Sequence, residues 1–388
     1  MTSRHPPVLA LLAAVLAAAG CESTTVPNDP ASLAKSKPAP GPATVSVFAT
    51  GLEFPRGLTF GPSGILYVAE AGTAGTGATT PEQCAQVIPP TGPYFNGPTG
   101  RISAIDHHGN RSTFADGFPS GINAFGDVQG VADVAFQGGK LYALVAGGGC
   151  SHGSANVPAG IARVSSSGTW TITADLSAWQ AANPVAHPNP ADFEPDGSWY
   201  GMIRFGESLV AVEPNHGEVV RVNPRTGAVT RIVDLSASLG HIVPTVVAER
   251  HGALYLSSLG VFPVVPGLEQ ILRISRSGAL SVVAEGFTTV LGLDFDRRGR
   301  LYVLETSSVA GFPTPGTGRV LRLDRHGNRV VVVDNLFLPT GLRFGPDGRL
   351  YISNKGFGPP QPGEILRVEI PGANSGDAAD DMEPADAS

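Results

Sequence analysis

The stretch Gly292-Leu-Asp-Phe-Asp-Arg-Arg-Gly-Arg-Leu-Tyr302 decides the fold, because its pattern returns six times along the chain. In each copy a short apolar run leads into a polar turn, and then into an apolar run that ends in Leu-Tyr or a near equivalent. The copies begin at Gly57, Asp133, Tyr200, Thr245, Gly292 and Gly341. Repeats of roughly 40–50 residues that read as short strands are typical of the blades of a β-propeller.

Each copy is followed by a third β-branched run, such as Glu364-Ile-Leu-Arg-Val368, and five copies by a fourth. The sixth copy lacks the fourth run, and a matching run, Val45 to Leu52, precedes the first copy instead. The sequence therefore predicts an all-β fold: a six-bladed β-propeller of four-stranded blades over residues 45–370, with the last blade closed by the N-terminal strand. A β-sandwich is the alternative, but it predicts neither the repeat nor the split blade.

The two ends of the chain differ from the repeats. Residues 1–20 are typical of a signal peptide, because Arg4 and His5 precede an apolar run that is too short to span a bilayer. The small residues before Cys21 resemble a bacterial lipoprotein signal, in which this Cys is lipidated; ordinary secretion with an incidental Cys21 is the alternative. Residues 21–44 are typical of a flexible tether and residues 371–388 of a disordered acidic tail.

These segments predict an extracytoplasmic, membrane-anchored bacterial lipoprotein, in the periplasm or at the cell surface, that touches the membrane through its lipid only. The formal net charge of −7 and a charged content of 15% include no basic stripe, which argues against a nucleic-acid partner. We expect a monomer. Export also favours a disulfide between Cys84 and Cys150, which lie in long insertions of neighbouring blades; two unpaired cysteines are the alternative.

The connections between the expected strands are of two kinds. The first-to-second and third-to-fourth connections are tight turns such as Gly345-Pro-Asp-Gly348. The second-to-third and blade-to-blade connections are long, as in residues 72–100 and 147–160. Because propeller strands alternate in direction, the long connections share one face, and function concentrates on such loops.

Polar side chains end the second strands and point towards this face, and others stand where the blades begin. Those that we expect to bind a ligand are Glu70, Asp133, Glu213, Glu305 and Asn354. Arg56, Asp127, Thr245 and Thr340 stand at the starts of blades. The three strand-end acids, Glu70, Glu213 and Glu305, together with hydroxyl and amide groups around a mouth could hold calcium or a polar ligand. The alternative is that these side chains cap strand ends and bond to loop backbone.

The region before the third copy is distinctive. A short helix is expected at residues 176–182, and the carboxylates Asp192, Glu194 and Asp196 then precede Trp199 and Tyr200. This loop could grip a sugar or a cation, or could pack on the ring as a proline-locked lid.

Several segments together resemble the ScyD/ScyE propeller family over roughly residues 45–370. They include Phe48-Ala-Thr-Gly-Leu52, Leu66-Tyr-Val-Ala-Glu-Ala-Gly72 and Pro98-Thr-Gly-Arg-Ile102. The chain departs from the family at Ser198-Trp199, where members often have Asn-Pro. The resemblance implies an exported propeller and assigns it no chemistry.

These features favour a binding module for an unknown small molecule or envelope protein over an enzyme. The enzyme alternative is a calcium-dependent lactonase or related hydrolase of the six-bladed type, which would need several oxygen ligands converging on the axis. A structural assembly factor is a third hypothesis. The sequence contains no nucleophile elbow, zinc-protease motif or phosphate-binding loop.

Overall fold

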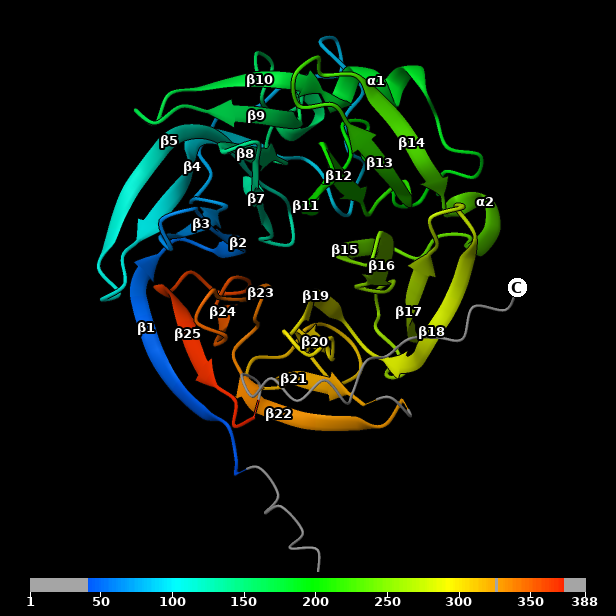
Figure 1. Ribbon diagram of the computed structural model, residues 1–388. Coiled ribbons are helices and arrows are strands. Elements are labelled where there is room, and N and C mark those ends of the chain that lie inside the picture. Colours follow the sequence, from blue (N-terminus) through cyan, green and yellow to red (C-terminus); the bar gives the residue numbers. More distant parts are fainter. Residues whose placement is uncertain (1–40, 325–326, 373–388) are drawn as a thin grey trace, which may run out of the picture. The chain divides into compact units, whose positions relative to one another are not determined.

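The computed structural model describes residues 41–324 and 327–372. These residues form six antiparallel sheets arranged in a ring around a central axis (Figure 1), so the predicted six-bladed propeller is confirmed. The predicted signal peptide, Cys21, most of the tether and nearly all of the acidic tail lie outside the described residues. Within the described part of the chain, no helix is long and apolar enough to cross a membrane.

The strands of each blade follow one another from the axis outwards, apart from the strand that closes the ring. Blade one consists of β2 (Pro55–Phe60), β3 (Leu66–Glu70), β4 (Phe95–Ile105), β5 (Arg111–Ile122) and the short β6 (Val128–Gln129). Blade two consists of β7 (Val131–Gln137), β8 (Lys140–Val145), β9 (Gly160–Val164) and β10 (Trp170–Asp175). Blade three consists of β11 (Gly201–Phe205), β12 (Ser208–Glu213), β13 (Glu218–Val222) and β14 (Val229–Asp234). Blades four to six consist of β15 (Pro244–Arg250), β16 (Ala253–Ser258), β17 (Glu269–Ile274) and β18 (Leu280–Phe287); β19 (Val290–Phe295), β20 (Leu301–Glu305), β21 (Gly318–Leu323) and β22 (Arg329–Leu336); β23 (Gly341–Phe344), β24 (Leu350–Asn354), β25 (Gly363–Glu369) and β1 (Thr44–Leu52).

The ring closes as the sequence predicts. Strand β1 lies antiparallel to β25 on the outside of blade six, with Val45 opposite Val368 and Ala49 opposite Ile365. Leu52, at the end of β1, is buried in an apolar cluster that also contains residues of blade one. The N-terminal strand therefore both completes the last sheet and helps to seal the last blade against the first.

The apolar core is divided among the seams between neighbouring blades. Six clusters of buried residues each contain strands from two adjacent blades. The Leu-Tyr of the repeat has a role here, because Tyr67 of blade one meets Phe136 of blade two edge-on, with ring centroids 5.2 Å apart. Tyr255 and Phe295 repeat this contact between blades four and five. Edge-to-face aromatic pairs stabilise a contact beyond the area that they bury, so the repeat encodes the seams.

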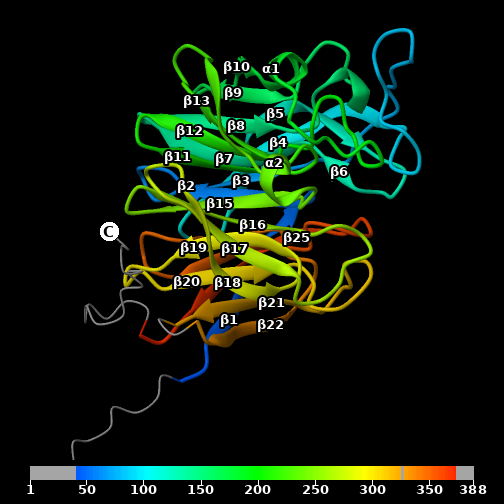
Figure 2. The same cartoon turned by 90° about the vertical axis from the view of Figure 1, so that its right-hand side faces the viewer.

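The two faces of the ring differ (Figure 2). Tight turns such as Gly61–Ile65 lie on one face, where β1 begins at Thr44. The long connections gather on the opposite face, which we call the loop face. They contain the 3-10 helix η1 (Cys150–His152) and the helices α1 (Leu176–Ala182) and α2 (Ser236–Leu239). The helix expected at residues 176–182 is confirmed, and Asp175 caps it by accepting a hydrogen bond from the backbone N–H of Ala178.

Candidate functional site

A cavity of about 740 Å³ opens on the loop face at the mouth of the ring. Its walls are of two kinds. All the charged lining residues belong to the first three blades and their loops: Arg56, Asp127, Asp192 and Glu194. The lining from blades four to six is almost entirely apolar and includes Val243, Leu259, Phe262, Leu291, Phe312 and Phe357. All the charged groups of the cavity therefore lie on one side, which we call the polar wall although it also contains apolar residues such as Phe54 and Ile122, and we call the opposite side the apolar wall.

Arg56 forms the first polar group of the cavity. Its Nη2 donates to Asp127 Oδ1 at 3.1 Å and to the carbonyl oxygen of Val128 at 2.6 Å. The guanidinium also faces the ring of Tyr200, 5.9 Å from the centroid. Burial is the largest cause that raises the pKa of Tyr200 to about 12, so this phenol stays protonated at neutral pH. This part of the cavity therefore presents the guanidinium of Arg56, whose charge Asp127 balances, beside the neutral hydroxyl of Tyr200.

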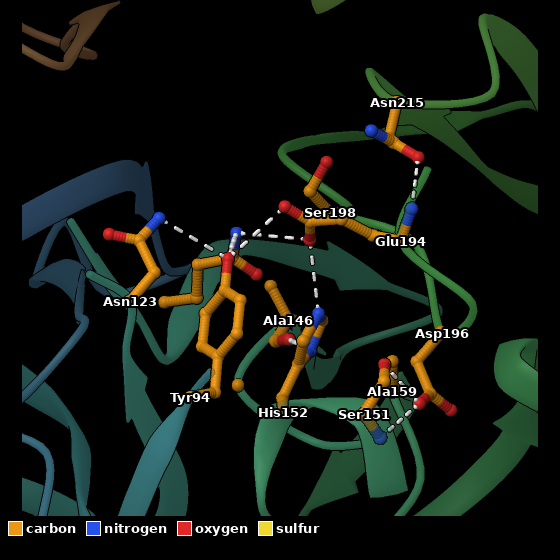
Figure 3. Close-up of polar contacts among 12 residues, drawn as sticks. Tyr94, Asn123, Ala146, Ser151, His152, Ala159, Glu194, Asp196, Ser198 and Asn215 are labelled. Carbon is orange, nitrogen blue, oxygen red and sulfur yellow. Dashed lines mark hydrogen bonds and ion pairs between the residues drawn. The ribbon is translucent and has the colours of Figure 1, made fainter. Parts of the chain in front are cut away.

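Glu194 forms the second polar group (Figure 3). Its Oε1 accepts a hydrogen bond from the Tyr94 hydroxyl at 3.2 Å, and its Oε2 lies 3.1 Å from Nε2 of His152. The same Tyr94 hydroxyl accepts from Nε2 of Gln129 at 2.9 Å. Burial, and then the charge of Glu194, raise the pKa of Tyr94 well above its ordinary value. The phenol therefore remains a donor to the carboxylate.

The contacts of His152 fix its protonation. Nδ1 lies 2.8 Å from the carbonyl oxygen of Gly148 and 3.1 Å from that of Ala146, and both are acceptors, so Nδ1 carries a hydrogen. Burial by itself would lower the pKa of His152, but the hydrogen bond with Glu194 and the charges of Glu194 and Asp196 outweigh it and raise the pKa. Because Nε2 then faces a carboxyl oxygen at 3.1 Å, the buried pair shares one further proton.

The disulfide helps to place this pair. Cys84 and Cys150 are bonded, with their Cα atoms 6.2 Å apart, as the sequence predicts. Cys150 begins η1, and the next two residues hold the blade-three loop: Ser151 donates to Asp196 from its backbone N–H, at 2.8 Å, and from its hydroxyl, while His152 contacts Glu194. The insertions of blades one and two thus clamp the carboxylate-rich loop against the cavity.

Three exposed aromatic residues stand at the rim of the cavity. The rings of Phe262 and Phe312 are stacked with centroids 5.2 Å apart, and Phe125 lies 6.4 Å from Phe312. Reciprocal backbone hydrogen bonds between Val264 and Gly311 join the loops of blades four and five. We call Phe125, Phe262 and Phe312 the aromatic rim; they are 55%, 41% and 60% exposed. Exposed aromatics gathered at a cavity mark a binding surface.

The carboxylates expected to bind a ligand share a different arrangement. Glu70 accepts from the backbone N–H of Glu53 at 2.6 Å and pairs with Arg101. Glu305 accepts from the backbone N–H of Thr288 at 2.8 Å and pairs with Arg319. Each thus joins the second strand of its blade to the segment that leads into the first strand.

Glu213 and Asn354 act similarly. Glu213 Oε1 accepts from the backbone N–H groups of Ser198 and Asn215, at 2.7 and 3.0 Å, and Asn354 Oδ1 from that of Phe337 at 3.0 Å. All of these side chains are buried. Neither these two nor Glu70 and Glu305 line the mouth cavity, so ligand binding by them stays a prediction.

Asp133 links two blades. Its Oδ2 accepts from the backbone N–H of Met202 in blade three at 2.8 Å, and its Oδ1 from its neighbour Val134. Asp294 repeats the contact with Phe344 between blades five and six. Burial raises the pKa of Asp133 to about 6, against the opposing charge of Arg343 and the two backbone hydrogen bonds. Asp133 lies in the narrow channel beneath the mouth.

The predicted acids do not converge on a metal position. Among residues 41–324 and 327–372, no three His, Cys, Asp or Glu side chains are grouped so that they could hold a metal ion. A calcium site needs several oxygens around one point. The described carboxylates therefore form no three-residue cluster, and calcium binding by the predicted acids stays a prediction.

Comparisons with known proteins identify solved structures that share the fold. No family model matches the chain, and no curated protein matches it. A protein of unknown function from Bacteroides thetaiotaomicron is similar, with a TM-score of 0.54, 13% identity and coverage of 84% of this chain and 76% of the other. Regucalcin from Agrobacterium tumefaciens, described as a calcium-binding protein, has a TM-score of 0.52, 16% identity and coverage of 85% and 95%. At such identities the likeness shows a shared propeller fold alone.

Proposed function

We propose that the protein is a binding module that takes a mainly apolar organic molecule with one polar edge into the mouth cavity. The observation that carries this proposal is the division of the cavity into an apolar wall from blades four to six and a polar wall from blades one to three. The volume of about 740 Å³ lies within the range of small-molecule sites, which combine apolar walls with a few placed polar groups. Long loops on a rigid ring provide such a site.

Titration with Nile red, a neutral apolar dye, tests this proposal. The folded protein should raise the dye's fluorescence to saturation at one dye per chain. An excess of a non-fluorescent molecule of similar shape should displace Nile red and lower its fluorescence. A rise that never saturates, or no rise while circular dichroism shows the folded state, would contradict the proposal.

The predicted location is part of the proposal. A lipidated Cys21 would attach the protein through the segment before β1, and β1 begins on the face opposite the mouth. The Cys84–Cys150 disulfide supports an oxidising compartment. In fractionated cells, the Cys21→Ser substitution should move the protein out of the membrane fraction. An unchanged distribution between fractions would contradict the lipid anchor.

A calcium-dependent lactonase is the second candidate, and the fold shared with the calcium-binding regucalcin favours it. Glu70, Glu213 and Asn354 already accept hydrogen bonds from backbone N–H groups of their own blades, so they would have to exchange these partners to hold calcium. Calorimetric titration with calcium, together with an assay of glucono-δ-lactone hydrolysis, separates the two. The binding module predicts neither tight calcium binding nor calcium-dependent turnover, and finding both would favour the lactonase.

A further inference from the structure

Glu194 lies on the cavity wall with spare capacity to accept hydrogen bonds. A carboxylate offers about four lone-pair positions. Oε1 accepts from Tyr94, and Oε2 faces His152, with Gln129 farther off at 3.5 Å. Because Tyr94 and His152 hold both oxygens in place, the carboxylate is fixed rather than free to rotate (Figure 3).

Each acidic side chain that lines this part of the cavity has a basic partner: Glu194 faces His152, Asp127 pairs with Arg56, and Asp192 lies 2.8 Å from Nε2 of His241. With Nδ1 of His152 protonated, one further proton lies between Nε2 and Glu194, so the pair carries no net charge wherever that proton resides. Arg56 is likewise compensated by Asp127. A charged ligand group buried here would have no countercharge to offset its desolvation. The polar wall therefore favours a neutral group.

Buried polar atoms without partners indicate which neutral group. Among the described residues, the indole N–H of Trp199, the hydroxyl of Thr306 and Oε1 of Gln129 make no hydrogen bond. All three residues line the cavity, and Trp199 and Thr306 are at most 1% exposed. Buried polar groups in proteins nearly always have partners. Trp199 offers only a donor and Gln129 Oε1 only an acceptor, and a hydroxyl group complements both because it donates and accepts.

From these contacts we infer that the subsite around Glu194 binds the neutral, hydroxyl-bearing edge of the ligand, with Glu194 and Gln129 as acceptors and Trp199 as donor. The ligand class is a neutral hydroxylated molecule whose apolar body lies against blades four to six. This inference rests on the proposed function, since it assigns the polar edge of the molecule that the mouth cavity takes.

A set of probes with one apolar body and different polar groups tests the inference. 2-Naphthol, 2-naphthoate and 2-naphthylmethylammonium are each used to displace Nile red at pH 7. A charged group would lose its hydration here without gaining a free countercharge, so 2-naphthol should bind at least about tenfold more tightly than either ion. Tighter binding of the anion or of the cation would overturn the inference.

Variants locate the effect. Glu194→Gln should remove most of the advantage of 2-naphthol, whereas the matched control Glu207→Gln, which lies exposed on the turn face, should keep it. Tyr94→Phe, which removes the hydroxyl that orients Glu194, should also weaken 2-naphthol binding. Retention of the full advantage in both variants would contradict the assignment.

If Nile red itself does not bind to the folded protein, the proposed function fails. If the dye binds but an ion outcompetes 2-naphthol, only the neutral-edge inference fails.

Discussion

The ring of Tyr351 in the last blade meets the ring of Phe60 in the first blade edge-on, with centroids 5.0 Å apart. Tyr351 also packs edge-on against Phe48 of β1, at 5.2 Å. One side chain of the repeated Leu-Tyr thus joins the two ends of the ring and the strand that closes it. Closure of the propeller depends on this seam as well as on the β1–β25 ladder.

Removal of β1 should therefore destabilise the whole ring. A chain that starts at residue 53 loses the outer strand of blade six and the buried Ala49 and Leu52. We expect it to lose cooperative thermal unfolding, measured by circular dichroism. A chain that starts at residue 44 keeps β1 and serves as the control. Equal stability of the two chains would contradict the role of β1.

The disulfide should stabilise the fold and the polar wall together. Closing a loop with a separation of 66 residues contributes about 4 kcal/mol in the chain-entropy model. Cys84→Ser/Cys150→Ser should lower the free energy of unfolding by up to this amount and should weaken 2-naphthol binding, because Cys150 begins the helix that carries His152. A reductant should have the same effect on the wild type and none on the variant. If the reductant changes neither the free energy of unfolding nor 2-naphthol binding of the wild type, the disulfide does not stabilise the fold or the polar wall.

Stability should fall as the pH rises from about 4 to 6. Asp133 has a folded-state pKa of about 6 against an ordinary 3.8, so the folded protein holds more protons than the unfolded chain in this window. The loss is on the order of 3 kcal/mol across two pH units. Asp133→Asn cannot ionise and should reduce this slope, leaving the part that comes from Glu218, whose pKa burial raises to about 7. Asp116→Asn, at an exposed position, should leave the slope unchanged. Denaturant titrations at several pH values measure both slopes, and identical slopes in wild type and Asp133→Asn would refute the assignment.

The aromatic rim should contribute to ligand binding and little to stability. Phe312 is exposed and contacts Phe262 at the edge of the cavity. Phe312→Ala should weaken Nile red binding by about three- to tenfold, the range expected when one aromatic contact is lost, without a change in the melting temperature. Val331→Ala, which removes an exposed apolar side chain from an outer strand, is the control. Unchanged dye affinity in Phe312→Ala would move the apolar contact elsewhere.

The fold could be predicted from the sequence because each repeat repeats its contacts. Tyr67 meets Phe136 for the same reason that Tyr255 meets Phe295, so one pattern encodes several seams. The closing strand was predictable because one blade lacked its fourth run. The disulfide was predictable because only two cysteines remained after Cys21.

The site was predictable only in part. The carboxylates of the blade-three loop, including Glu194, and the polar residues at the starts of blades, including Arg56, stood out in the sequence. The sequence did not indicate where the strand-end acids point. A Glu that bonds to loop backbone and a Glu that faces a channel occupy the same repeat position, and Glu70 bonds to backbone. The aromatic rim gave no signal, since Phe125 and Phe312 lie in insertions outside the repeat and meet only in three dimensions.

Hydrogen–deuterium exchange of the intact protein, with and without saturating Nile red, tests most directly the claim that the mouth cavity is the functional site. Dye bound in the mouth cavity should protect residues 122–129, 192–200, 259–264 and 306–313, which contribute both walls of the cavity. The turn face and the outer strands should exchange as before. Protection confined to the turn face or the outer strands, with the mouth loops unchanged, would contradict it.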